Sequence, residues 1–359
     1  MDMLRTALIS LLCAMALILP ASASDYGASA VEEALPEEAR EIIGSGAVEE
    51  ALEPEGMLSR LWEAALSRVK ELFAPAAGSA AAILCAALLC SAVQAFADGQ
   101  AEEYVTLAGV LAVTAIAIGD ARTFISAGTE ALGELNTFSH ALLPSLTAAA
   151  AAGGAVTSAA AKYAATALFM DVLITAARGI IIPLAYIYMA AAVAHAATGS
   201  AAAAGAAGIL KWLAMSATAL IMTAFTAYLS ISGAVSGAAD AVTLRTAKSA
   251  ISTALPVVGG IISDAAGTVV AGAGLIKGAV GSLGLVATAA VCLTPFISLG
   301  LQYLMYKLAA ALAEAFAPGR LPKLISSLGG VFGMVLGVVG AAALMLFISV
   351  ASLIRTVAA

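Results

Sequence analysis

Six stretches of this chain are apolar over about 20 residues, the length that an α-helix needs to cross the hydrocarbon core of a bilayer. Hydrophobic residues make up 62% of the 359 residues, and charged residues only 11%. Soluble domains carry about 25% charged residues, and a soluble helical protein needs charged helix faces that this sequence lacks. We therefore predict an all-α, polytopic helical membrane protein. The predicted spans are 76–97, 104–119, 163–195, 212–233, 281–303 and 329–353.

Two further apolar stretches, 141–161 and 251–273, have a different composition. Both are rich in Ala, Gly, Ser and Thr, and both begin at a Leu-Pro pair. Small residues let neighbouring helices approach closely. We expect these two stretches to pack inside the bundle without fully crossing it.

The segment 240–281 is apolar enough for membrane depth but contains Pro256, the Gly259–Gly260 pair and Asp264. Irregular backbone and an ionisable group are tolerated at that depth only where protein or a water-filled cavity covers them. We therefore expect broken or re-entrant helices here and predict that these four residues are path or helix-break residues. An N-cap of the helix that follows is the alternative role for Asp264.

Four prolines recur with a regular spacing. Pro144 precedes Pro183 by 39 residues, and Pro256 precedes Pro295 by the same 39. An internal duplication explains this spacing, and chance matching of Ala-rich sequence is the alternative. Paired broken segments in two halves of a chain are typical of transport folds, so Pro144, Pro183 and Pro295 join the candidate path or helix-break residues. The two copies would cover residues 137–233 and 249–345.

Four charged residues are candidates for ion pairs or partner contacts. Asp171 and Arg178 are seven residues apart, two helical turns, so they share a helix face. We predict that they form structural ion pairs with a neighbouring helix rather than a proton relay. Arg245 and Lys248 also share a face and mark a cytoplasmic loop, where they would meet anionic headgroups or a cytosolic partner.

Catalytic patterns are missing from the sequence. The two histidines, His140 and His195, have no cysteine or acid at ligand or triad spacing, and the four cysteines form no CxxC pair. No glycine-rich phosphate loop opens a helix after a strand. We expect no enzymatic activity, no cofactor and no metal, and we expect no nucleic-acid partner because no basic patch is interleaved with aromatic residues.

The N-terminal part divides into segments of different composition. Residues 1–23 have the charged start, apolar core and small-residue end of a signal peptide, with an uncleaved anchor as the alternative. Residues 24–56 are acidic and extracytoplasmic, either a spacer or a docking arm. Residues 57–74 predict an amphipathic interfacial helix with Trp62 at headgroup depth, although packing against the bundle gives the same pattern. The multi-span domain is then 75–359, and the mature N-terminus is extracytoplasmic.

A specific set of short motifs lies in the second half of the chain. These motifs are Ala238–Asp240, Leu244–Lys248, Leu255–Gly260, Ser263–Asp264 and Lys277–Gly281. With them the chain resembles the stage III sporulation protein AE family of endospore-forming bacteria. The signal peptide, the acidic segment and the multi-span body agree with the same family.

This resemblance implies a subunit of the stage III A complex in the mother-cell membrane that surrounds the forespore. The subunit would form or gate part of a transport path between the two cells. The alternative is a membrane scaffold that recruits ring subunits and the secretion-type ATPase and has no path of its own. The implied partners are membrane lipids, the other stage III A-operon proteins and, through the complex, stage II sporulation protein Q.

Overall fold

The computed structural model describes residues 37–43, 54–96, 100–152, 155–254, 259–317 and 319–355. Within these ranges it describes most side chains, with a gap from 233 to 282. All regular structure in these ranges is helical. The helices are α2 (Glu37–Ile43), α4 (Pro54–Gln94), α5 (Gln100–Ala152), α6 (Val156–Ala176), the π-helix η1 (Ala177–Ile181), α7 (Ile182–Thr198), α8 (Ala201–Ala254), α9 (Gly259–Ala313) and α10 (Arg320–Arg355).

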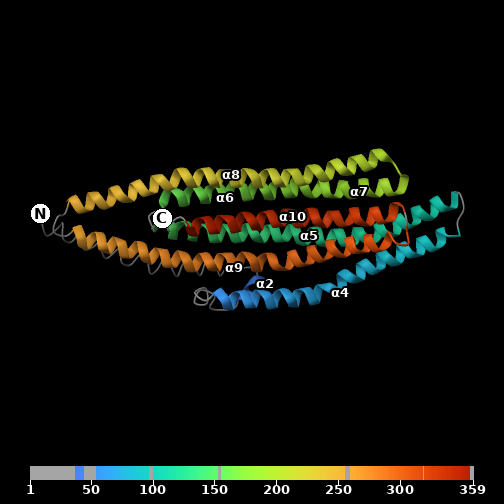
Figure 1. Cartoon of the computed structure of the whole chain (residues 1–359), viewed down its shortest axis with the longest axis horizontal. Coiled ribbons are helices and arrows are strands. Elements are labelled where there is room, and N and C mark those ends of the chain that lie inside the picture. Colours follow the sequence, from blue (N-terminus) through green and yellow to red (C-terminus); the bar gives the residue numbers. More distant parts are fainter. Residues whose placement is uncertain are drawn as a thin grey trace.

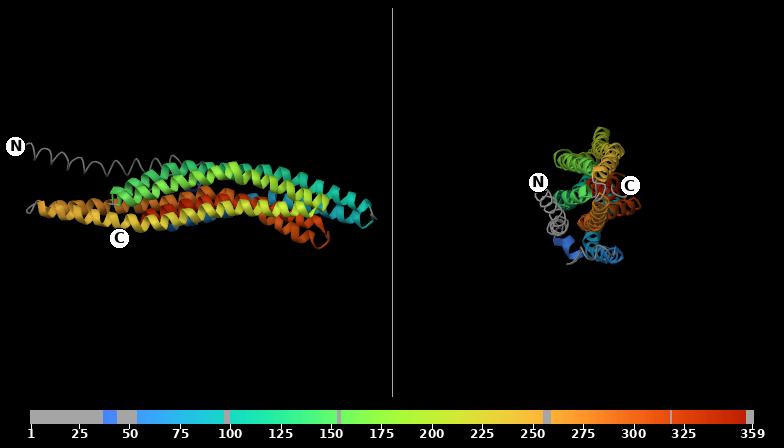
Figure 2. Two further views of the ribbon diagram at one scale, coloured as in Figure 1. Left: turned by 90° about the horizontal axis from the view of Figure 1, so that it is seen from above. Right: turned by 90° about the vertical axis from the view of Figure 1, so that its left-hand side faces the viewer.

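The long helices lie side by side and alternate in direction, which gives an elongated up-and-down bundle (Figure 1). The bundle is gently curved along its length (Figure 2). Helix α4 ends and α5 begins at one end of it, whereas α8 ends and α9 begins at the opposite end (Figure 1). Helices α5, α8 and α9 contain 53, 54 and 55 residues. At a rise of 1.5 Å per residue each is about 80 Å long, so each extends well beyond a hydrocarbon core of about 30 Å.

Helix α10 is the central helix of the bundle, because it packs against α5, α6, α7, α8 and α9. The most apolar part of α10 is 61% buried, more than that of any other described helix that is long enough to cross a membrane. Between Lys323 and Arg355 it carries no charged residue. Lipid or protein can cover such an apolar helix, and here the five neighbouring helices leave Val331, Val339 and Leu346 fully buried.

The predicted class of protein is confirmed. Six helical segments in the described part of the chain are long and apolar enough to cross a membrane. They are Ser59–Gln94, Gln100–Ala151, Val156–Thr198, Ala201–Ser232, Leu283–Ala313 and Arg320–Ile354.

We had expected the stretches 141–161 and 251–273 to be separate segments inside the bundle. The helix bounds show a different arrangement. The first covers the end of α5 and the beginning of α6, and the second covers the end of α8 and the beginning of α9. Their small residues therefore lie at helix ends, where the chain reverses direction (Figure 1). The periodicity of such Ala-rich sequence does not distinguish one short helix from the adjoining ends of two long ones.

The segment 240–281 is interrupted, because α8 ends at Ala254 and α9 begins at Gly259. Gly259 and Gly260 are therefore the first residues of the helix that follows the interruption, and α9 continues through Asp264. Pro256 lies outside the described residues. The path or helix-break role of these four residues stays a prediction.

The other three prolines lie inside helical segments. Pro144 lies within α5 and Pro295 within α9, and both helices continue past them. Pro183 is at the beginning of α7, directly after the π-helix η1. A π-helical turn is rare and is frequently found at functional sites. The span that the sequence places at 163–195 is therefore one helical rod with a local irregularity before its proline.

Helix α4 joins two segments that the sequence separated, because it runs without a break from Pro54 through Pro75 to Gln94. Leu61 packs against the main hydrophobic cluster of the bundle. Trp62 is 67% exposed, and Phe73 is also exposed. The segment 57–74 thus contacts the bundle with one face and presents an aromatic face outward. The predicted signal peptide, 1–23, lies outside the described residues.

The predicted duplication can be compared with the helix directions. The rod α6–η1–α7 falls in the first proposed copy and α9 in the second, and both run in the same direction along the bundle (Figure 1). Two such copies would form a parallel rather than an inverted repeat. The duplication itself stays a prediction.

The alternation of directions places the beginning of α4 and the α8–α9 connection on one side of the membrane if every span crosses it. An extracytoplasmic mature N-terminus and a cytoplasmic Arg245 and Lys248 are then incompatible, since these two residues lie in the last turns of α8. We predict that single cysteines at Ser59 and Ala254, in a cysteine-free variant, react with a membrane-impermeant maleimide from the same side. A cysteine at Ser200 should react only from the other side. Labelling of Ser59 and Ala254 from opposite sides would mean that an odd number of helices crosses between them.

Close packing of α5 against α10 generates a second prediction. A side chain at Gly128 would meet Val335 of α10, whereas one at Gly119 on the same helix would meet nothing within 4 Å. We expect Gly128→Leu to lower the free energy of unfolding by about 1–3 kcal/mol because it overpacks this contact. Gly119→Leu is the matched control and should change it by about 0.5 kcal/mol or less. Unfolding in detergent, followed by circular dichroism, measures both, and an equal loss in the two variants would contradict this packing.

Candidate functional site

A carboxylate in the interior of the apolar bundle connects three helices. Asp120 of α5 accepts a hydrogen bond at Oδ1 from the Ser79 hydroxyl of α4, over 3.1 Å. At Oδ2 it accepts one from Gln302 Nε2 over 2.8 Å and one from the Tyr306 hydroxyl over 2.6 Å, both on α9. Asp120 is half-buried, and Gln302 and Tyr306 are fully buried. We call these four residues the Asp120 cluster.

The spacing of the residues explains the geometry of the cluster. Gln302 and Tyr306 are four residues apart, so one face of α9 presents both side chains to Asp120. The Tyr306 ring packs edge-on against Phe332 of α10, with 5.0 Å between ring centroids. Phe332 in turn packs against Phe124, one helical turn after Asp120, at 5.6 Å. These aromatic contacts hold the phenol hydroxyl at the carboxylate.

The electrostatics of the Asp120 cluster are unusual, because the three groups that hydrogen-bond to the carboxylate are neutral. In the part of the chain that the structure describes, Asp120 forms no ion pair within 4 Å. A charge removed from water is costly unless a counter-charge or hydrogen bonds compensate it. Gln302 Oε1 is also buried and has no hydrogen-bond partner among the described residues. The site therefore contains one carboxylate that is stabilised by neutral donors without an ion pair among the described residues, and one unused oxygen acceptor.

The Asp120 cluster also lies at the point where the uncharged part of α5 and the uncharged part of α9 both end. Helix α5 has no charged residue between Glu103 and Asp120, and α9 has none between Lys277 and Lys307. The two helices are antiparallel, so these parts extend from the cluster toward opposite ends of the bundle (Figure 1). A bilayer that covered both parts would enclose Asp120, and one that covered a single part would place it at a membrane face.

A second polar contact directly follows the cluster on α9. Lys307 Nζ donates to the carbonyl oxygen of Ser326 over 3.0 Å and to its hydroxyl over 2.7 Å. The same ammonium lies 5.8 Å from the centroid of the Tyr303 ring. This lysine is therefore compensated by α10 and by its own helix.

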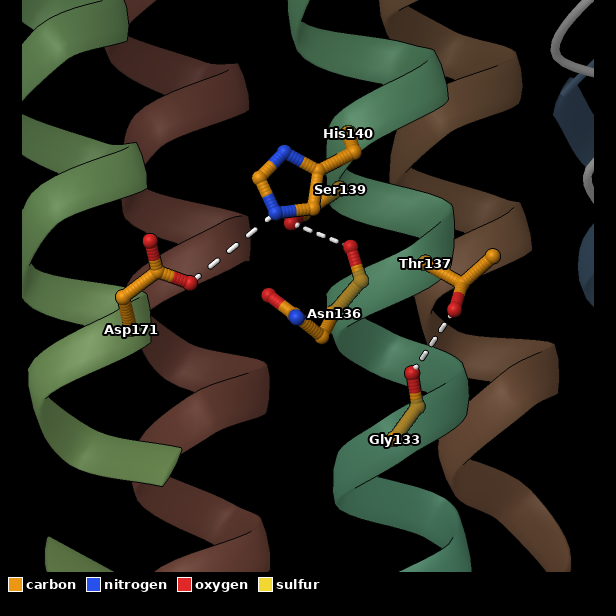
Figure 3. A network of polar contacts seen from close by, with 6 residues as sticks. All are labelled: Gly133, Asn136, Thr137, Ser139, His140 and Asp171. Atoms are coloured by element: carbon orange, nitrogen blue, oxygen red, sulfur yellow. Dashed lines mark hydrogen bonds and ion pairs between the residues drawn. The ribbon is translucent and has the colours of Figure 1, made fainter. Parts of the chain in front are cut away.

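Asp171 and Arg178 both face α5. This is the neighbouring helix with which we predict them to form structural ion pairs. Asp171 Oδ1 lies 3.9 Å from His140 Nε2 of α5, at a site where both side chains are about half exposed (Figure 3). A side chain added at Gly133 of α5 would lie 3.2 Å from the Arg178 guanidinium. Around His140, Ser139 and Thr137 hydrogen-bond to backbone carbonyl groups of their own helix (Figure 3). The role that we predict for Asp171 and Arg178 as structural ion-pair residues stays a prediction.

The other predicted residues are placed by their backbone alone. Arg245 and Lys248 lie in α8, and Gly260 and Asp264 lie in the first turns of α9. Their side chains lie outside the described part of the chain.

Sequence reasoning missed Asp120 because the predicted span ended one residue before it, at Gly119. The helix does not end there, since α5 continues to Ala152. Two signals were present in the sequence. Gln302 and Tyr306 are polar side chains at helical spacing within an apolar run, and Ser79 lies within the first predicted span. Such polar groups need partners in a membrane, so they indicated a polar contact but not the residue that completes it.

The described side chains contain no group of three His, Cys, Asp or Glu residues arranged to hold a metal ion. The Asp120 cluster offers one carboxylate, two hydroxyl groups and one amide. An arrangement of this kind can exchange a proton or coordinate a cation through oxygen atoms.

The fold and the Asp120 cluster define a polytopic helical membrane protein with an ionisable site inside its bundle. The family profile described as Stage III sporulation protein AE (spore_III_AE) matches residues 41–356. The chain belongs to this family. The resemblance seen in the sequence is thereby confirmed.

One curated relative is the stage III sporulation protein AE of Bacillus subtilis (strain 168), which is 28% identical over 204 residues. The aligned part covers 57% of this chain and 51% of the relative, so the chain spans about half the length of that protein. No solved structure matches the chain.

The hydrogen bonds of the Asp120 cluster generate a prediction about stability. Tyr306→Phe keeps the packed ring but removes the donor to Asp120, so the free energy of unfolding should fall by about 1.5–3 kcal/mol, as for hydrogen bonds to charged groups. Tyr303→Phe on the same helix is the matched control, because the hydroxyl of Tyr303 has no hydrogen bond among the described residues. We expect a change of about 0.5 kcal/mol or less in the control. Denaturation of the purified protein in detergent compares the two, and equal values would mean that the Tyr306 hydroxyl contributes nothing.

Proposed function

We propose that this chain is a membrane subunit of the stage III A sporulation complex, which links the mother cell to the forespore, and that it forms or gates part of a transport path. The observation that supports a transport path is Asp120, an ionisable group in the bundle that residues of two other helices hold by hydrogen bonds. Ionisable residues within membrane bundles mark substrate, ion or proton pathways.

The proposed location is the mother-cell membrane around the forespore, with several spans and an extracytoplasmic mature N-terminus. In that orientation the α8–α9 connection also lies outside the cytoplasm, if all six spans cross. The proposed partners are membrane lipids, the other stage III A-operon proteins and, through the complex, stage II sporulation protein Q. Family membership supports an association with the stage III A system and with a membrane, and the individual partners are part of the proposal.

A scaffold without a path of its own is the second candidate function, and a separate observation favours it. Helices of 53 to 55 residues extend beyond any bilayer. Such extensions could present surfaces to ring subunits and to the secretion-type ATPase. The packed interior around α10 also agrees with a rigid platform.

Substitution of Asp120 distinguishes the two functions. In an endospore-forming host that depends on this chain, we expect Asp120→Asn to reduce late forespore gene expression and spore yield strongly, while the other stage III A proteins still co-purify with the variant. The reason is that Asn keeps the size of the side chain but removes its charge. A forespore reporter gene, heat-resistant colony counts and co-purification are the three measurements.

Two further variants complete this experiment. Glu103→Gln changes an exposed carboxylate on the same helix as Asp120 and is the matched control, which should sporulate normally. Asp264→Asn tests the residue that the sequence favoured. Normal sporulation of both the Asp120 and Asp264 variants would exclude a carboxylate path and favour the scaffold, and loss of co-purification on deletion of 25–55 would identify that segment as a docking arm.

A further inference from the structure

The buried amide of Gln302 is the starting point for an inference about a ligand. Gln302 has no exposed surface, its Nε2 donates to Asp120, and its Oε1 has no hydrogen-bond partner among the described residues. A buried polar atom without a partner costs about 1–3 kcal/mol. Such an atom beside a carboxylate that has no ion pair among the described residues points to a further occupant of the site.

The charge of the site limits what this occupant can be. Asp120 contributes a single negative charge, and the described residues provide no cationic side chain within ion-pair distance of it. One monovalent cation balances this charge, whereas a divalent ion would leave a net positive charge inside the bundle, which is costly. The ligand class is therefore a monovalent cation.

The available ligand atoms also fit such an ion. The hydroxyl oxygens of Ser79 and Tyr306 keep lone pairs when they donate to the carboxylate, and they can turn these toward a cation. A half-turn of the Gln302 amide exchanges its nitrogen and oxygen, which are of nearly equal size, and brings Oε1 to the position that Nε2 now holds at 2.8 Å from Asp120. All the ligand atoms are then oxygens, the type that hard cations prefer.

We infer that the Asp120 cluster binds a small alkali cation, of which Na⁺ is the representative, between Asp120, Gln302, Ser79 and Tyr306. The carboxylate and its partners lie only 2.6–3.1 Å apart, so they have to separate to admit an ion, and the smaller Na⁺ needs less separation than K⁺. The bound ion joins α4, α5 and α9 and satisfies Gln302 Oε1. Its role in transport rests on the proposed function, but its binding does not.

The test uses the purified full-length chain in detergent. A ligand that binds only the folded protein raises the unfolding temperature in a saturable way. At constant ionic strength, we expect replacement of choline chloride by NaCl to raise the unfolding temperature, and replacement by KCl to raise it less. Equal shifts with all three salts, or no shift with NaCl, would overturn the inference. A stability that depends on pH but not on Na⁺ would also overturn it and would identify a proton as the occupant.

Three variants assign the effect to the site. Asp120→Asn should abolish the Na⁺-dependent shift, and Gln302→Leu should weaken Na⁺ binding by about ten- to a hundredfold, as removal of a supporting group at a metal site does. Asp171→Asn should retain the full shift, because its carboxylate lies elsewhere on the bundle. For variants whose unfolding temperature differs from that of the unsubstituted chain, isothermal titration with NaCl measures the Na⁺ affinity directly. A full Na⁺ response in Asp120→Asn would disprove the site.

The result is separable from the sporulation experiment. Na⁺ binding together with normal sporulation of Asp120→Asn would mean that the ion is structural, which keeps the cation site and rejects the path. No Na⁺ binding together with failed transport in Asp120→Asn would keep the path and reject the cation site.

Discussion

The hydrocarbon core of a bilayer offers no hydrogen-bond partners, and the architecture of this protein follows from that constraint. Every long segment that the structure describes is helical, so that its backbone groups bond within the segment. Helix α10 occupies the centre, and helices α5 to α9 pack around it. Polar side chains inside the bundle then have to find one another, because neither lipid nor apolar side chains can hydrogen-bond to them. The Asp120 cluster and the contact between Lys307 and Ser326 are two results of this requirement.

The same constraint makes the Asp120 cluster a structural element of the bundle, and the proposed function rests on this cluster. Hydrogen bonds from α4 and α9 converge on one carboxylate of α5, and the aromatic packing of Tyr306 on Phe332 adds α10 to the group. Four helices thus depend on the state of a single ionisable residue. A change of charge or of bound ion at Asp120 would alter the contacts between these helices. That coupling is what a gated path requires, and family membership places it in a sporulation protein.

The prolines and glycines that the sequence marked as helix breaks do not all interrupt a helix in the structure. Pro144 and Pro295 lie within continuous helices, because the neighbouring helices in a bundle can accommodate a proline and its lost hydrogen bond. Gly259 and Gly260 begin a helix rather than break one. Of the three candidate prolines that the structure describes, only Pro183 adjoins an irregular backbone, the π-helix of 177–181. A single residue type therefore did not predict the local backbone, since packing decides whether its intrinsic preference is expressed.

The sequence by itself determined the class of this protein, its family and most of its spans, because long uncharged apolar runs have one stable arrangement in lipid and the motif at 244–264 is specific. Only the tertiary structure decided which polar groups meet. Gln302 lies 182 residues from Asp120, and Ser79 lies 41 residues from it. Whether such residues touch depends on the rotation and axial position of three long helices, and a pattern along the chain specifies neither. The site therefore became visible only when packing had fixed both.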